Sequence, residues 1–508
     1  MKFGEFSGIP FSYFDIFSER AFLIVHHSLV ENSEFIPKNL LYKINPSTGF
    51  ITFTYNDISN VVGSMTQKMN AEEEKVNQPI PIILSNPFDL ILSVLSLWRL
   101  HTIPVPLNIH LLKNDLLNQI NFLSADKIIC KTEHAEDFSS LKRFPFTNFD
   151  LTIKSLTTDL NSESTAVMLF TSGTSGKPKA VPLSFGNLFA AFNSGKTIFG
   201  YSGTDSWYLN LPLYHIGGFS ILARAIYAGS SIILPESNDL DVLENNLKFV
   251  KPTLLSLVPT QLKRICENGI KPNSELRAVL IGGGFSDESI LTNASNLDWK
   301  IFKVYGSTET SAFVAALHPK EVNAKPNSVG KPLQNVEIKI FDDERNYVPV
   351  NMSGEIALKT ESLFSGYLNN DEATSAAFSN GYYLTGDFGF FDEDGYLFLE
   401  DRRTDLIVSG GENISPNEIE HVISQFPNIE EVCVFGLPDK EWGECIAAVV
   451  TSKDGNEIKM SGLKIFLREN LPSFKLPKTF FQVKELPKSA IGKIKRAEVK
   501  KFFTRSQT

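Results

Sequence analysis

A run of small hydroxyl and glycine residues, closed by two lysines, is the part of this sequence best suited to hold phosphate. Residues 171–180 read TSGTSGKPKA. Small residues let backbone N–H groups approach anionic oxygens closely. The spacing is not that of the common P-loop, because the two glycines enclose two residues instead of four and a proline follows the first lysine. A flexible polar loop is the alternative. The candidate phosphate-binding residues are Thr171, Ser172, Gly173, Thr174, Ser175, Gly176, Lys177 and Lys179.

Four further segments have a composition that could support chemistry. They are YGSTET at 305–310, YLTGD at 383–387, DRRTDLIVSGGENISPNEIE at 401–420 and PKSAIGKIKR at 487–496. The first is expected to be a tight turn that presents hydroxyls and the carboxylate of Glu309, and the second places Asp387 just after a glycine turn. Taken singly, each segment has a structural interpretation: a capped turn, a surface acid, a linker and a solvated basic tail.

The elements that position these segments follow from the apolar pattern. Strand-like runs at 80–84, 103–106, 206–210, 231–234, 253–258 and 278–281 alternate with helix-period segments such as 87–100 and 111–123. This alternation predicts an α/β fold with stacked, mostly parallel sheets. The runs at 336–341, 354–359 and 396–399, joined by tight turns, predict an antiparallel β subdomain.

A polar segment at 401–405 separates this pattern from the last hundred residues, which mix short strands and helices. We therefore expect two domains, 1–401 and 402–508, the second a small α+β unit. Within it, Ser415 as N-cap, Pro416 in the first turn and Glu418 predict a helix that starts with a capping box.

Bulk composition narrows the function classes. The net charge of −10 argues against a nucleic-acid-binding surface. The four cysteines are scattered and show no zinc spacing, which suits a reducing compartment. The N-terminus lacks the pattern of a signal peptide, and the most apolar run, 90–100, is too short to span a bilayer. We expect a cytoplasmic protein without stable membrane insertion. The sequence does not decide between a monomer and a homo-oligomer.

In their order and separations, the five motifs closely resemble those of the adenylate-forming enzymes, a superfamily of acyl- and aryl-CoA synthetases, luciferases and peptide-synthetase adenylation domains. The resemblance extends from 53 to 496. It implies that a carboxylate attacks the α-phosphorus of ATP, that pyrophosphate leaves, and that a thiol, usually that of coenzyme A, then cleaves the acyl-adenylate. It also implies an AMP-binding domain at 1–401 and a mobile C-terminal domain at 402–508.

The resemblance assigns roles to individual residues. The loop from Thr171 to Lys179 would cradle the β- and γ-phosphates, Glu309 would hold Mg²⁺, and Thr308 would donate to the α-phosphate. Asp387 would bind the ribose hydroxyls with support from Arg402. The residues that would surround the adenine are Gly282, Gly283, Gly284, Tyr305, stacked on the base, and Gly306 in the same turn.

Lys493 is expected to reach from the small domain and stabilise charge between the carboxylate and the α-phosphate, a role that the planar fork of Arg would not fill. The small domain would then rotate about a hinge at Thr404, and the turn at 409–411 would face the pantetheine channel. The sequence departs from the family at Thr404, where many members have Asp or Lys, and has Ala180 and Asp401 where Gly is common.

The acyl pocket is expected beside LPLYHIGG at 211–218, in which His215 is either a gate of the pocket or a core histidine. Together with GGG before YGSTET, this segment looks most like the o-succinylbenzoate–CoA ligases of menaquinone synthesis. Other aryl- and medium-chain acyl-CoA ligases share these words. A loader of a carrier protein and a non-catalytic relative are further alternatives; retention of Glu309 and Lys493 argues against the last.

Overall fold

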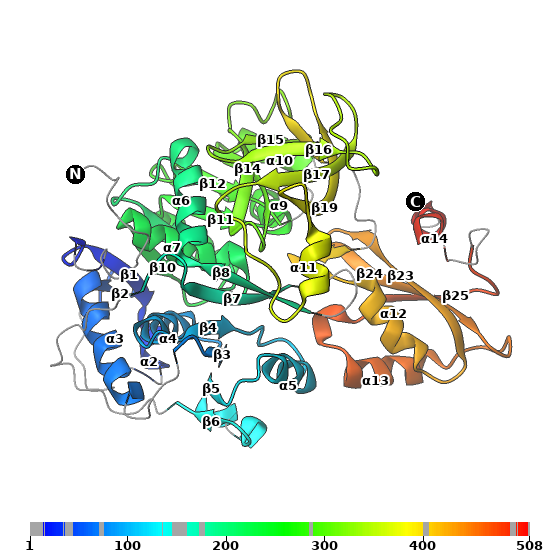
Figure 1. The fold of residues 1–508 in the computed structure, drawn as a ribbon, viewed down its shortest axis with the longest axis horizontal. Coiled ribbons are helices and arrows are strands. Elements are labelled where there is room, and N and C mark those ends of the chain that lie inside the picture. Colours follow the sequence, from blue (N-terminus) through cyan, green and yellow to red (C-terminus); the bar gives the residue numbers. More distant parts are fainter. Residues whose placement is uncertain are drawn as a thin grey trace.

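The computed structural model describes residues 14, 16–33, 35, 44–70, 76–134, 136–144, 160–171, 178–283, 288–399, 406–487, 494 and 496–505 of the 508-residue chain. The structure has a large N-terminal domain and a smaller C-terminal domain, which lies at the right of Figure 1. Both have the mixed α/β character that the sequence predicts.

The parallel core of the large domain is built from strands in the order β13-β12-β11-β9-β10-β1, with β2 antiparallel at its edge. Their bounds are β1 (Ala21–His26), β2 (Phe50–Thr54), β9 (Ser206–Tyr208), β10 (Ser231–Leu234), β11 (Leu254–Leu257), β12 (Ala278–Ile281) and β13 (Ile301–Ser307). Every residue of β10, β11 and β12 is buried. Continuous burial is typical of parallel strands covered on both faces.

A second, smaller parallel sheet has the order β4-β3-β5-β6 and lies at the bottom of Figure 1. It consists of β3 (Pro79–Ile83), β4 (Ile103–Pro106), β5 (Lys127–Cys130) and β6 (Lys142–Arg143). The antiparallel hairpin of β7 (Thr165–Thr171) and β8 (Lys179–Ser184) encloses the predicted phosphate loop. Its strand ends fix where that loop begins and ends.

Helices connect these strands. They are α2 (His27–Glu31), α3 (Tyr55–Asn70), α4 (Pro87–Arg99), α5 (Lys113–Phe122), α6 (Phe185–Phe199), α7 (Ile216–Ala228), α8 (Leu240–Phe249), α9 (Pro259–Glu267) and α10 (Glu288–Asn296). The predicted helices at 87–100 and 111–123 correspond to α4 and α5. Among the described residues, none of the helices is long and apolar enough to cross a membrane.

The predicted antiparallel subdomain continues the large sheet. It contains β14 (Ala312–Leu317), β15 (Ser328–Pro332), β16 (Glu337–Phe341), β17 (Gly354–Lys359), α11 (Asp371–Ala377), β18 (Phe378–Ser379), β19 (Tyr382–Phe391) and β20 (Leu397–Leu399). Hydrogen bonds from β14 to β15 and from β15 to β20 join it to β13. At the crossing, a β-carbon on Gly330 (φ +90°) would lie 1.9 Å from Ala316, so only glycine fits.

The small domain has its own sheet, with the order β22-β21-β24-β23 and β25 parallel to β24. Its elements are β21 (Ile407–Ser409), β22 (Glu412–Ile414), α12 (Pro416–Ser424), β23 (Ile429–Asp439), β24 (Gly443–Ser452), α13 (Met460–Asn470), β25 (Thr479–Gln482) and α14 (Arg496–Arg505). The predicted capping box is wrong. Ser415 is the N-cap and Pro416 opens α12, but the Ser415 side chain makes no capping hydrogen bond. The carboxylate of Glu418 instead accepts from Lys475 Nζ at 2.6 Å, because a charged partner binds it more strongly.

Candidate functional site

A cleft of about 3090 Å³ lies between the two domains and gathers most of the predicted site residues that the structure describes. Its lining includes the ends of β7, β8, β12 and β13 and the middle of β19 from the large domain, and the turn between β21 and β22 from the small domain. The predicted residues along it are Thr171, Lys179, His215, Gly282, Gly283, Tyr305, Gly306, Thr308, Glu309 and Asp387. Residues up to 216 positions apart (387 − 171) therefore share one wall.

The YGSTET segment forms the end of β13 and a strained turn into β14. Ser311 and Ala312 have positive φ values of 56° and 117°. A β-carbon on Gly306 would lie 1.7 Å from the Ala312 carbonyl oxygen, so the close approach requires glycine. Thr310 Oγ1 holds the turn by accepting from Ser307 N (2.9 Å) and donating to Ala312 O (2.7 Å). Backbone strain maintained in this way is typical of functional sites.

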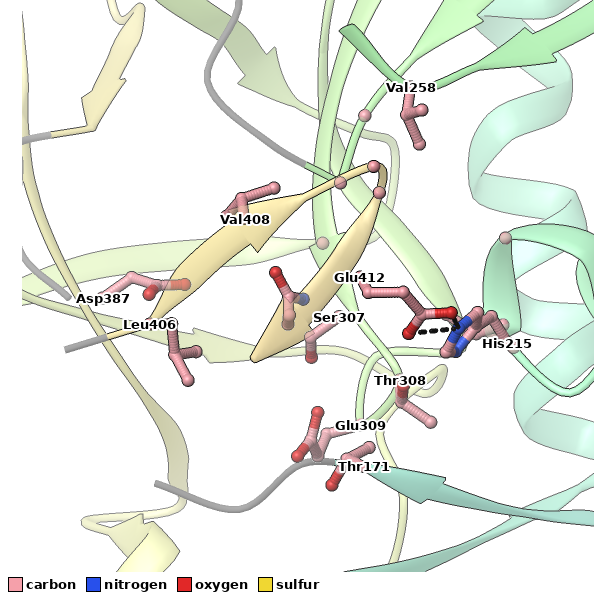
Figure 2. A pocket seen from close by; sticks show the side chains of 18 of the residues that line it. Thr171, His215, Val258, Ser307, Thr308, Glu309, Asp387, Leu406, Val408 and Glu412 are labelled. Atoms are coloured by element: carbon pink, nitrogen blue, oxygen red, sulfur yellow. Dashed lines mark hydrogen bonds and ion pairs between the residues drawn. The ribbon is translucent and has the colours of Figure 1, made fainter. Parts of the chain in front are cut away.

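Glu309 projects from this turn into the cleft, near Thr308 and Thr171 (Figure 2). Its carboxylate accepts a hydrogen bond from Tyr367 Oη at 3.0 Å. No cation of the described part of the chain forms an ion pair with it. A single carboxylate suits Mg²⁺, because this ion completes its coordination with water and substrate phosphates. The donor set therefore fits the predicted metal.

Asp387 lies in a bulge within β19, where Gly386 has φ +69°, and not after a turn as the sequence suggested. Its Oδ2 accepts from Tyr305 Oη at 2.9 Å. Since Tyr305 is 8% exposed, this contact fixes the carboxylate against a buried ring. Gly282 follows β12, and a β-carbon there would lie 2.9 Å from Val304 Cγ2, which explains the small residue at this side of the cleft.

The β21–β22 hairpin is the part of the small-domain wall that reaches toward Val258 and His215 (Figure 2). Gly410 and Gly411 form its turn with φ values of 61° and 92°, and a β-carbon on Gly411 would lie 3.2 Å from Val258 Cγ1. Because glycine adopts these φ values and this close approach without strain, the turn can enter the large domain's side of the cleft.

His215 forms a polar contact between the two walls. Its Nε2 lies 3.1 Å from both carboxylate oxygens of Glu412, and its side chain is 40% exposed. The interpretation of His215 as a core histidine is therefore wrong. Burial acts to raise the pKa of Glu412, but the hydrogen bond and charge of His215, with smaller contributions from His110 and Lys475, lower it overall.

Helix α9 provides further contacts to the small domain. Arg264 donates to the Glu441 carbonyl at 3.1 Å and lies over the Trp442 ring at 5.2 Å. Lys263 Nζ donates to the Lys440 carbonyl at 3.0 Å. These partners are exposed, so each contact contributes little by itself.

Sequence reasoning missed Arg224, in the middle of α7. It lines the cleft, is 5% exposed, and lies between the rings of Phe313 (4.2 Å) and Trp207 (5.5 Å). Within the described part of the chain it has no hydrogen-bond or ion-pair partner. Burial lowers the pKa of Arg224. An arginine inside the apolar helix IGGFSILARAIYA was a signal that the sequence did contain, because an unpaired buried charge is costly.

Several predicted residues lie outside the described ones. They are Ser172, Gly173, Thr174, Ser175, Gly176, Lys177, Gly284, Asp401, Arg402, Thr404 and Lys493. Ala180, in contrast, is described: it is buried in β8 and is not among the residues with positive φ. This departure from the family pattern therefore causes no backbone strain.

Comparison with known proteins gives a consistent result. A sequence model of the AMP-binding enzyme family matches residues 42–368, and one of the AMP-binding enzyme C-terminal domain matches residues 418–493. The 2-succinylbenzoate–CoA ligase of Listeria innocua is 34% identical over 454 residues, which cover 88% of this chain and 94% of that protein.

Two solved structures of the o-succinylbenzoate CoA synthetase of Bacillus subtilis are also similar. A double mutant bound with its product analogue has a TM-score of 0.85 at 27% identity and covers 98% of both chains. The complex with ATP and magnesium has a TM-score of 0.70 at 27% identity and covers 97% of this chain and 99% of that one. Identity and coverage are nearly equal, so this chain superposes more closely on the product-analogue complex than on the complex with ATP and magnesium.

Proposed function

Because this chain belongs to the AMP-binding enzyme family, we propose that it joins a carboxylic acid to coenzyme A in two steps driven by ATP. In the first step a carboxylate oxygen attacks the α-phosphorus, and the bond to the β-phosphate oxygen breaks to release pyrophosphate. In the second step the sulfur of coenzyme A, having lost its proton, attacks the acyl carbon, and AMP leaves with the carboxylate oxygen.

The large-domain wall supports the proposed roles in the first step. Asp387, whose carboxylate is held by Tyr305, would accept hydrogen bonds from ribose hydroxyls. Thr308 and Lys179 line the same cleft and supply a donor and a charge for phosphate oxygens. Glu309 would hold Mg²⁺, which neutralises charge on the phosphates when bound. Holding two anions together in this way supplies most of the catalysis.

The small domain supports the second step in the arrangement described. The Gly410–Gly411 turn lines the cleft beside Val258, where it would border the channel for the pantetheine thiol. Lys493 would act in the first step, and the small domain would then rotate about a hinge at Thr404 for the second step. The separate sheets of the two domains support the proposed division at 401–402.

The acid that the site favours is an aromatic dicarboxylate, and o-succinylbenzoate is the proposed substrate. The observation that carries this proposal is the buried, unpaired guanidinium of Arg224 beside the cleft. One carboxylate of the acid must react, so a second one is needed to pair with this cation, and a bidentate pair is the geometry that Arg favours. The relatives are named for an acid of this kind, because succinylbenzoate has two carboxylates.

A panel of acids tests the proposal by AMP release that depends on coenzyme A. We expect o-succinylbenzoate to exceed benzoate and medium-chain fatty acids in kcat/KM. Replacement Arg224→Met should lower kcat/KM for o-succinylbenzoate by about a hundredfold, while the exposed control Arg468→Met leaves it unchanged. A preference for a monocarboxylate would contradict the substrate. Dependence on a carrier protein would contradict coenzyme A as the acceptor.

We also propose a cytoplasmic location, which the four free cysteines fit.

A further inference from the structure

The segment 361–368 connects the turn that carries Glu309 with the hairpin that carries the phosphate loop. Phe364 N donates to the Glu309 carbonyl at 2.8 Å, and Leu368 N donates to the Ala180 carbonyl at 3.0 Å. The amide of Asn187, at the start of α6, donates to the carbonyls of Glu361 (2.9 Å) and Leu363 (2.8 Å). Backbone hydrogen bonds thus fix this segment to both parts of the site.

Tyr367 lies in this segment and contacts one charged group through its hydroxyl and another through the face of its ring. Its Oη donates to Glu309 Oε1 at 3.0 Å, and Lys179 Nζ lies over its ring, 4.5 Å from the centroid. The ring is 9% exposed and packs edge-on against Phe364 at 4.8 Å. Tyr367 N donates to Thr374 Oγ1 at 2.9 Å. The tyrosine is therefore held by its backbone and by its ring.

These contacts restrict two flexible side chains that would act on the same ligand. A hydrogen bond to one carboxylate oxygen fixes the rotamer of Glu309 and uses only one of its roughly four acceptor sites. A cation over a ring face keeps its N–H donors available while it loses rotamer freedom. A metal ion and a phosphate group arriving together then meet ligands that are already in place.

We propose that Tyr367 is a positioning residue for the metal–triphosphate complex. Its hydroxyl aims Glu309 at Mg²⁺, and its ring holds Lys179 toward the phosphates. The proposal rests on the function proposed above, because that function supplies the nucleotide and the metal.

The two ends of the side chain can be separated by substitution. In Tyr367→Phe the ring remains, so only the dependence of nucleotide binding on Mg²⁺ should weaken. In Tyr367→Leu nucleotide binding without Mg²⁺ should weaken as well. We would titrate the full chain with α,β-methylene-ATP in a calorimeter at several Mg²⁺ concentrations. For Tyr367→Phe we expect the Mg²⁺ concentration at half-saturation to rise about tenfold, as for loss of a hydrogen bond to a charged group.

Tyr396→Phe is the matched control. Tyr396 Oη donates to Glu321 Oε1 at 2.8 Å, and Lys325 (5.1 Å) and Lys331 (4.4 Å) lie over its ring. Neither Tyr396 nor Glu321 lines the cleft. Removal of this hydroxyl should therefore leave the Mg²⁺ dependence unchanged, although it deletes the same kind of hydrogen bond.

Thioester formation from supplied acyl-adenylate should be the same in wild type and Tyr367→Phe, since that step no longer involves the triphosphate. Equal Mg²⁺ dependence of Tyr367→Phe and wild type would overturn the proposal, and so would an equal loss in Tyr396→Phe. The binding assay contains no acid. A chain that binds the nucleotide with metal yet releases no AMP from any acid would contradict the ligase function alone.

Discussion

The two walls of the cleft are held in different ways. On the large-domain wall, two carboxylates accept hydrogen bonds from buried tyrosines: Asp387 from Tyr305, and Glu309 from Tyr367. On the small-domain wall, the hairpin turn meets its neighbour through glycines and the partly exposed pair His215–Glu412. The large-domain contacts lie within one domain and would persist whichever way the small domain lay, whereas the hairpin's contacts are weak enough that they would be exchanged under the two-step function proposed above.

Glu309→Gln should break the large-domain wall alone and give the largest effect. Loss of the charge that would hold Mg²⁺ should slow adenylate formation on the order of a thousandfold. Thioester formation from supplied acyl-adenylate should stay near the wild-type rate. Pyrophosphate release and thioester formation, measured separately, check both. Equal losses in the two steps would mean that the walls are not functionally distinct.

Gly411→Val should affect the small-domain wall alone, and so slow thioester formation without slowing adenylate formation. A β-branched residue at φ +92°, with Val258 at 3.2 Å from the new β-carbon, opposes docking of the hairpin. We expect thioester formation to slow by about 10- to 100-fold, with adenylate formation unchanged. The matched control is Gly455→Val, which has a similar φ of +74° in the small domain but nothing within 4 Å. If both variants slow thioester formation alike, the hairpin's contact with Val258 is not the cause.

Lys303→Met measures how much a buried charge in the large-domain wall lowers the free energy of unfolding. Burial lowers the pKa of Lys303 to about 8, whereas an unfolded lysine has a pKa of about 10.4. The buried charge therefore opposes folding below pH 8, and this penalty fades as the pH rises toward 10. The shift corresponds to about 3 kcal/mol, and the lost hydrogen bond to Pro326 offsets about 1 kcal/mol. We expect the variant to gain about 1–2 kcal/mol at pH 7 and nothing at pH 10. Urea unfolding at both pH values checks this, and a gain that grows with pH would contradict it.

The pair His215–Glu412 should give the smallest effect. A double-mutant cycle with His215→Ala and Glu412→Gln should yield a coupling of about 0.5–1 kcal/mol in the thioester step. Because the docked pKa of Glu412 is lowered, its contribution is complete above the ordinary carboxyl pKa of about 4.3 and is lost as the pH falls through the lowered value. Docking should thus be independent of Glu412 titration between about pH 6 and 8. Domain distance by fluorescence transfer checks this, and a coupling near zero would remove the pair from the docking contacts.

Much of the fold was predictable because local pattern and long-range packing agree. The apolar runs became the buried strands β10, β11 and β12 with bounds close to those predicted. The capping box failed because Lys475, 57 residues away, competes for Glu418. Similarly, the sequence predicted that the runs between 336 and 399 are antiparallel, but not that backbone pairing joins them to the parallel strands.

The site was predictable where motifs gather chemical groups and not where one side chain serves another. Glu309 and Asp387 lie in motifs of unusual composition, and both line the cleft in the structure. Tyr367 lies in an ordinary loop, so only its three-dimensional contacts reveal it. Arg224 is intermediate: its charge within an apolar helix was visible, but the rings of Phe313 and Trp207 that enclose it come from two distant strands, β14 and β9.

The pairing of β1 with β10 has a consequence for biosynthesis. Leu23 in β1 pairs with Ile232 in β10, so 209 further residues (232 − 23) must be synthesised before β1 can pair with β10. Until then the apolar stretch AFLIVH has no parallel partner while the ribosome is still translating. Nascent chains of this protein should therefore depend on chaperones that shield their amino-terminal part, and ribosome-bound fragments ending before β10 should aggregate more readily than longer ones.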